Sequence, residues 1–172
     1  KNVADRKNEA IKTALARPEK LVMASWFGYD AADATAALQG AIGSGAKKVV
    51  IDKVGEWIVD RIFLTNDQEL EFEKGVVLSA KKGAFKGKND SILNGIGLRN
   101  SVITGNGALV RMWKADYFGP GYDRAEWRMA LNLRSASNVR VSDITLKDCG
   151  GDGVYLGNLG APHLPGCFDV VL

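Results

Sequence analysis

The sequence predicts an all-β fold, a right-handed parallel β-helix (solenoid) with short N-terminal capping helices. Short strands of alternating apolar residues meet at glycine-rich turns over residues 138–156. The same pattern occurs in residues 100–110 and begins again at residues 168–172. From residue 47 onward no helical pattern separates the strands, which disfavours a doubly wound sheet because its parallel strands need helical crossovers. One coil cannot bury its own apolar face, so we expect the copies to stack.

Residues 1–46 are expected to form an N-terminal helical cap on this stack. Residues 3–17 carry an apolar stripe at helical spacing, which predicts a short amphipathic helix. Residues 35–42 show the same spacing, with Leu38 and Ile42 on one face. Because the open end of a stack of strands exposes apolar side chains, we expect these two residues to cover that end.

Residues 47–172 are expected to form the parallel coils, with the last coil incomplete at the C-terminus. The first strands are predicted at residues 48–52, 57–64, 69–73 and 76–79. Residues 113–127 interrupt the pattern with aromatic, glycine and proline residues and should form a long loop. The apolar residues expected to fill the interior of the later coils are Val139, Val141, Ile144, Leu146, Val154 and Leu156.

The composition is that of a soluble domain or a piece of one. The 172 residues are 46% hydrophobic and 25% charged, and no apolar run is long enough to cross a membrane. A net charge of +3 does not call for nucleic acid, although lysines within residues 81–88 can form a patch for an acidic polymer. Cys149 and Cys167 cannot build a zinc site; they are expected as small buried residues, with a disulfide as the alternative.

Two segments resemble the pectate-lyase-like right-handed parallel β-helix superfamily. The first, Asp33-Ala-Thr-Ala-Ala-Leu-Gln-Gly-Ala-Ile, is similar to the Asp-x-Thr-x-x-Leu-Gln-x-Ala-Ile helix that precedes the first strand in that group. The second, Gly150-Gly-Asp-Gly-Val-Tyr-Leu-Gly, is similar to a Gly-Asp-Gly-Ile coil of bacterial and polygalacturonase-like members. The resemblance covers residues 32–172. It departs from the group at residues 52–56, where the usual proline-glycine turn is replaced.

The resemblance implies a carbohydrate-active protein that binds and usually cleaves polysaccharides, including acidic ones, and that is secreted or periplasmic. It does not choose between hydrolysis by paired carboxylates and β-elimination of uronates. Hydrolysis would require no cofactor, whereas a lyase could use calcium held by carboxylates. The alternative is a non-catalytic glycan-binding or structural module. The sequence shows no signal peptide, so the chain is either a mature or trimmed form or an intracellular protein. Its oligomeric state is left open.

Three carboxylates are the candidates for catalysis. Asp152 lies between glycines at a predicted coil corner, from which a carboxylate can reach a groove. Asp148, four residues earlier, and Glu126 can each act as its partner in acid–base chemistry. The alternative is that the aspartates are turn formers that bond their own backbone. His163, the sole histidine, lies between prolines and is interpreted as a loop residue rather than a general base.

Residues 128–134 predict a strand face that could bind a sugar acid. If the alternating apolar residues point inward, Arg128, Asn132 and Arg134 point outward together. Guanidinium groups pair with carboxylates and aromatic rings stack on sugars. The candidate substrate-binding residues are Arg128, Arg134, Asn132, Trp127, Tyr155 and Tyr122. The alternative is an ordinary solvent-facing strand beside a loop whose aromatics pack on their own scaffold.

Overall fold

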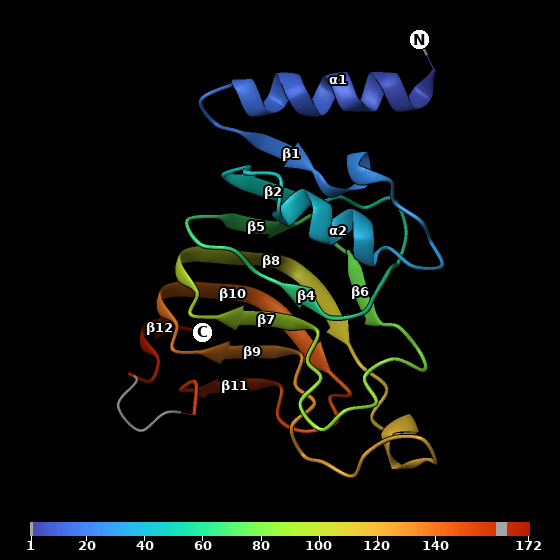
Figure 1. The fold of residues 1–172 in the computed structure, drawn as a ribbon, viewed down its shortest axis with the longest axis vertical. Helices are drawn as coiled ribbons and strands as arrows, with labels where there is room; N and C mark the ends of the chain where they lie inside the picture. The colour runs from blue at the N-terminus through green and yellow to red at the C-terminus, as the bar shows by residue number, and fades with distance from the viewer. Residues whose placement is uncertain (1, 161–164) are drawn as a thin grey trace.

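The computed structural model describes residues 2–160 and 165–172, and within them two parallel β-sheets form the body of the molecule (Figure 1). The larger sheet contains β1 (Leu21–Met23), β2 (Lys48–Ile51), β3 (Trp57–Val59), β5 (Glu69–Phe72), β6 (Val77–Ala80), β8 (Arg99–Arg111), β10 (Ser137–Lys147) and β12 (Phe168–Val171). The smaller sheet contains β4 (Ile62–Phe63), β7 (Leu93–Ile96), β9 (Leu131–Arg134) and β11 (Val154–Gly157). The helices are α1 (Val3–Ala16), η1 (Ala24–Phe27), α2 (Thr35–Ile42) and η2 (Asp116–Phe118).

The chain passes repeatedly from one sheet to the other, so that each passage adds a layer of strands. The larger sheet has the strand order β1-β2-β5-β8-β10-β12, with β3 and β6 joined to it through β8. The smaller sheet has the order β11-β9-β7-β4. As a result, residues roughly one layer apart in the sequence lie side by side in space, as Leu93 and Leu131 do.

The predicted fold class, an all-β right-handed parallel β-helix, is wrong. The structure is a mixed α/β fold with two parallel sheets, in which helices hold 17% and strands 36% of the residues. The helices are more than covers added to a β-structure, because η1 and α2 place Ala24, Leu38 and Ile42 in the same buried cluster as the strands. The prediction followed the glycine corners and the period-two alternation, which indicate strands. The share of the core that helices supply depends on tertiary packing, which this pattern does not show.

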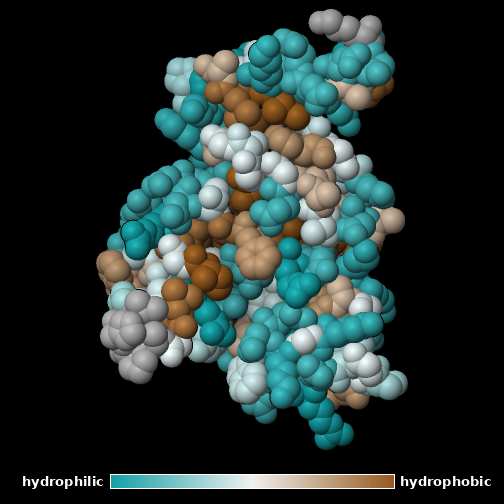
Figure 2. Space-filling model, in the orientation of Figure 1, coloured by the Kyte–Doolittle hydropathy of each residue, from teal (hydrophilic) through white to brown (hydrophobic). Residues whose placement is uncertain are grey.

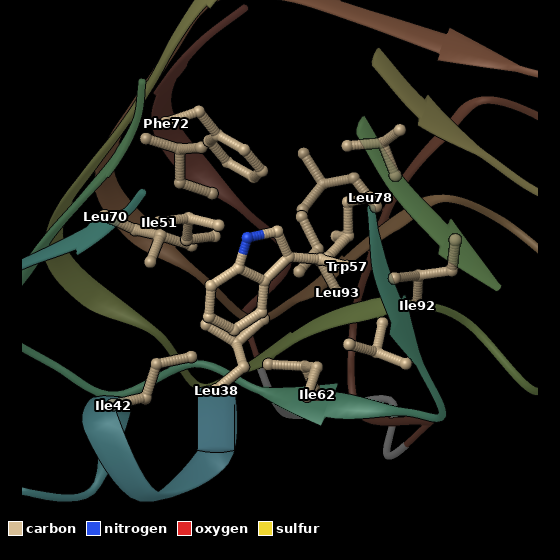
Figure 3. Packing of buried hydrophobic residues seen from close by; sticks show 14 of the residues in the cluster. Leu38, Ile42, Ile51, Trp57, Ile62, Leu70, Phe72, Leu78, Ile92 and Leu93 are labelled. Carbon is tan, nitrogen blue, oxygen red and sulfur yellow. The ribbon is translucent and has the colours of Figure 1, made fainter. Parts of the chain in front are cut away.

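The two predicted helices are confirmed as α1 and α2. Leu38 and Ile42 are 0% and 1% exposed and point from α2 toward Trp57 and Ile62, as Figure 3 shows. The expectation that these two side chains are buried against the strands is therefore confirmed. In α1, by contrast, Ala14 is the one buried residue, so this helix touches the rest of the molecule along a narrow strip.

The start of α2 is held by an aspartate. Asp33 accepts hydrogen bonds from the Thr35 amide at 3.0 Å and from Lys81 Nζ at 2.6 Å. The hydrogen bond from Lys81, followed by one from the Thr35 hydroxyl, lowers the pKa of Asp33 to about 2. Because Lys81 directly follows β6, this carboxylate connects the helix to the strand layers.

Only some of the six apolar residues predicted to fill the interior of the later coils are buried. Val139 and Val141 are 0% and 6% exposed, as predicted. Ile144, Leu146 and Val154 are only partly buried. Leu156 is 45% exposed, so its predicted place in the interior is wrong. Among the described residues β11 pairs with β9 alone, and no layer covers the far side of Leu156.

Two leucines in the same register test this gradient of burial. Leu133 lies beside Leu156 on the neighbouring strand and is 0% exposed. We expect Leu133→Ala to lower the free energy of unfolding by about 2–5 kcal/mol, the usual cost of truncating a buried leucine. Leu156→Ala should cost less than about 1 kcal/mol, as a surface change does. Urea denaturation followed by circular dichroism measures both, and equal losses would contradict the layered core.

Candidate functional site

Three of the predicted substrate-binding residues come together on the outer face of the smaller sheet. The strand register places Asn132 of β9 beside Tyr155 of β11, and Arg134 follows two residues along on the same face. Arg134 Nε donates a hydrogen bond to Asn132 Oδ1 at 3.3 Å. The guanidinium carbon of Arg134 lies 5.1 Å from the centre of the Tyr155 ring, which is a cation–π distance. We call Asn94, Asn132, Arg134 and Tyr155 together the sheet-face cluster.

A row of amides fixes the position of Arg134. Asn132 Nδ2 donates to Asn94 Oδ1 at 3.4 Å, and Asn94 Nδ2 donates to the carbonyl of Ser91 at 2.8 Å and that of Ile62 at 3.3 Å. Asn94 and Asn132 are 6% and 5% exposed, so water competes little for these bonds. The hydrogen bonds therefore run from Arg134 through two buried amides to the main chain of β4 and of the segment before β7.

Apolar side chains flank the sheet-face cluster. Phe63 is in register with Asn94, and Ile96 is in register with Arg134. The two apolar side chains are 54% and 46% exposed. Figure 2 shows apolar side chains gathered on the face that carries the smaller sheet in Figure 1. This face thus combines exposed apolar surface with an oriented guanidinium group.

A hollow of about 440 Å³ lies in the connections that precede β9 and β11. We call it the end-loop hollow. It is lined by Tyr117, Phe118, Arg124, Ala125, Glu126 and Gly150. Phe118 is 81% exposed, and Glu126 is exposed as well. Burial raises the pKa of Tyr117 to about 12, so this side chain stays neutral. The hollow therefore offers two aromatic rings, Tyr117 and Phe118, beside one cation and one carboxylate.

The expectation that Arg128 points outward with Arg134 is wrong, because Arg128 is 0% exposed. Its Nε donates to the Phe85 carbonyl at 2.7 Å, and its Nη2 donates to the carbonyls of Lys86 at 3.0 Å and Asp123 at 2.5 Å. Tyr122, another predicted substrate-binding residue, packs with Tyr117 beside this guanidinium group. The carbon of the group lies 5.2 Å from the Tyr117 ring centre and 5.8 Å from that of Tyr122. Arg128 therefore clamps the long loop instead of facing a ligand.

The three predicted catalytic carboxylates belong to two segments that touch. A Cβ atom at Gly151 would lie 1.8 Å from the carbonyl oxygen of Glu126, so the turn that holds Asp148 and Asp152 lies directly against the Glu126 segment. All three side chains are exposed, and none has a hydrogen bond or ion pair to another described residue. Asp148 has a φ of 53°, which fits a turn former. Their catalytic roles stay predictions.

The structure does not assign a role in this site to the other predicted features. Across residues 2–160 and 165–172, no group of three or more His, Cys, Asp or Glu side chains is placed to hold a metal ion. Cys149 and Cys167 are free thiols, and burial raises the pKa of Cys149. Trp127 is 50% exposed beside the hollow. His163 lies outside the described residues. None of the described helices is long and apolar enough to span a membrane.

Comparison with known proteins gives no family to this chain: no protein-family model, curated protein or solved structure matches it.

Sequence reasoning missed Asn94, although a signal for it exists. The dipeptide Leu93-Asn94 is repeated as Leu131-Asn132, and the register pairs the two copies residue for residue. Phe118 and Arg124 fall within the predicted loop, and both line the hollow beside the segment that the Arg128 clamp holds at the Asp123 carbonyl. No pattern in the sequence indicates that clamp.

The contact at Gly151 gives a test of how the two segments pack. Gly151→Ala should lower the free energy of unfolding by about 1–3 kcal/mol, because the added methyl group would overlap the Glu126 carbonyl. Gly166→Ala is the matched control, since nothing lies within 4 Å of its added Cβ. Thermal unfolding of the two variants would measure the difference, and equal midpoints would refute the close packing of the turn.

Proposed function

We propose that this chain binds an acidic polysaccharide on the outer face of the smaller sheet, with Arg134 as the residue that recognises a sugar carboxylate. The observation that carries the proposal is the state of the Arg134 guanidinium. Its Nε is held by Asn132, whereas its two terminal nitrogens have no hydrogen-bond acceptor among the described residues. A guanidinium held in this way can donate two parallel bonds to one carboxylate at a small entropic cost.

The surroundings of Arg134 fit a chain of sugar rings better than a single small anion. Phe63, Asn94, Asn132 and Tyr155 form one row across the four strands of the smaller sheet. With strands spaced by about 4.8 Å, the two aromatic residues at the ends of the row lie about 14 Å apart. Aromatic rings can stack on the apolar faces of sugars while Arg134 pairs with a charged substituent between them.

The sequence resemblance supports the same class of ligand. Asp33 to Ile42 and Gly150 to Gly157 are the two segments that resemble carbohydrate-active proteins. A protein that binds plant or microbial uronate polymers would meet them outside the cytoplasm, so secretion or a periplasmic location forms part of this proposal.

Arg134→Gln tests the role of the guanidinium. Loss of a charge-assisted hydrogen bond removes about 1.5–3 kcal/mol, so affinity for polygalacturonate should fall at least about tenfold. Arg140→Gln is the matched control, because Arg140 lies on the larger sheet and pairs with Asp169 at 3.1 Å. Isothermal titration with polygalacturonate and with a neutral glucan would separate charge recognition from stacking. Unchanged polygalacturonate binding by the Arg134 variant would contradict the proposal.

A second candidate function, cleavage of the polysaccharide at the end-loop hollow, is favoured by one observation. Glu126 lines the hollow with the exposed Phe118, and the turn that bears Asp148 and Asp152 is in contact with the Glu126 main chain. Glycoside hydrolysis needs two carboxylates on opposite sides of the scissile bond. Glu126 and Asp152 are the pair proposed for that chemistry, with Asp148 as the alternative partner.

Glu126→Gln and Asp152→Asn test cleavage without altering shape. If the pair is catalytic, each change should reduce turnover at least about a hundredfold, the lower range for a general acid or base. The thermal midpoint should stay within the range of Glu19→Gln, an exposed carboxylate outside the hollow. Release of reducing ends and absorbance of unsaturated products would distinguish hydrolysis from elimination. Full activity in both variants would exclude the pair, whereas binding through Arg134 would be unaffected.

A further inference from the structure

A second groove, with a volume of about 470 Å³, shares no residue with the sheet-face cluster or the end-loop hollow. It is lined by Lys53, Val54, Gly55, Glu56, Gly75, Val77, Leu109 and Arg111. Val77 and Leu109 are neighbours in the register of β6 and β8. The groove therefore has an apolar strip between two cationic side chains.

Arg111 is fixed in this groove by two side chains. Its Nη2 lies 2.7 Å from Glu56 Oε1, and its Nε donates to Ser79 Oγ at 2.8 Å. The Ser79 hydroxyl also bonds to Glu56, and these contacts lower the pKa of Glu56, the bond from Ser79 more than that from Arg111. Glu56 consequently stays ionised and balances the charge of Arg111 on one side. Nη1 of Arg111 has no acceptor among the described residues.

Lys53 supplies an unbalanced positive charge. Glu73 accepts a hydrogen bond from the Lys53 backbone amide at 2.7 Å, but within the described part of the chain no acceptor is bonded to Lys53 Nζ. The ammonium group extends over Gly75, where an added Cβ would lie 3.1 Å from Nζ. Gly75 has a φ of 78°, so glycine serves both the turn and the close approach of Lys53.

A third cationic side chain, Lys147, lies next to Arg111. Lys147 of β10 is in register with Arg111 of β8, and its side chain is exposed with no ion pair to another described residue. Adjacent strands are separated by about 4.8 Å, so Lys147 can reach a ligand that is held by Arg111. In the lining, Lys53 and Arg111 thus outnumber Glu56, the one carboxylate there, and Lys147 adds a positive charge beside Arg111.

We propose that this groove binds an oxyanion, a carboxylate, sulfate or phosphate, on a ligand whose apolar part lies over Val77 and Leu109. Lys53 and Nη1 of Arg111 donate the charge-assisted hydrogen bonds, and Glu56 holds Arg111 in place. This site does not depend on the sheet-face cluster. It would give the chain a second binding site for an anionic group, on a separate surface.

The test is a titration of the whole chain with sodium sulfate, sodium phosphate or glucuronate, with chloride replaced so that ionic strength is constant. The amide signals of Gly55 and Gly75 in nuclear magnetic resonance spectra report on the groove. Saturable shifts of these two signals are expected with at least one probe. The probe that saturates at the lowest concentration identifies whether a sugar acid or an inorganic ion is the better ligand.

Lys53→Gln should weaken that binding by about two- to fivefold, the upper part of the range for an exposed charge contact. Lys74→Gln is the control, because it removes the same charge from an exposed residue outside the lining. Arg134→Gln should leave the titration unchanged, which separates this groove from the proposed glycan face. Equal weakening by the Lys53 and Lys74 variants, or shifts that chloride reproduces, would overturn the proposal.

Discussion

Each layer of strands in this molecule depends on its neighbour both for main-chain hydrogen bonds and for apolar cover. Parallel strands leave donors and acceptors on both edges, and every apolar side chain of one layer needs a side chain from the next. Leu133 has such neighbours and is 0% exposed, whereas Leu156 in the same register is 45% exposed. At the other end, α2 supplies the cover with Leu38. Burial in this fold is therefore set by position in the stack more than by residue type.

The same stacking creates the candidate binding face. Because the register is kept from β4 to β11, equivalent residues of successive layers form rows across the outer face of the smaller sheet. A repeated amide in such a row bonds to its own copy, as Asn132 does to Asn94. That bond makes the two buried amides a rigid support for Arg134. The row therefore connects the regular architecture directly to a site with defined chemistry.

The sequence of this protein predicts the local secondary structure better than it predicts the fold class. Period-two alternation located most strands, and helical spacing located α1 and α2 at nearly the observed bounds. The fold class was wrong because patterns along the chain do not reveal how much of the core the helices supply. Arg134 and Asn132 could be placed outward from alternation alone. Arg128 could not, because its burial depends on carbonyl groups about 40 residues away, at Phe85 and Lys86.

The Arg128 clamp separates the frame of the end-loop hollow from the side chains that line it. The acceptors of Arg128 are the main-chain carbonyls of Phe85, Lys86 and Asp123, a group that every residue type supplies. The clamp therefore does not depend on the side chains at Lys86 and Asp123. The exposed lining residues Phe118 and Glu126 take no part in it. Changes at these two side chains would thus alter what the hollow can recognise while its frame stays fixed, which uncouples the selectivity of this pocket from its geometry.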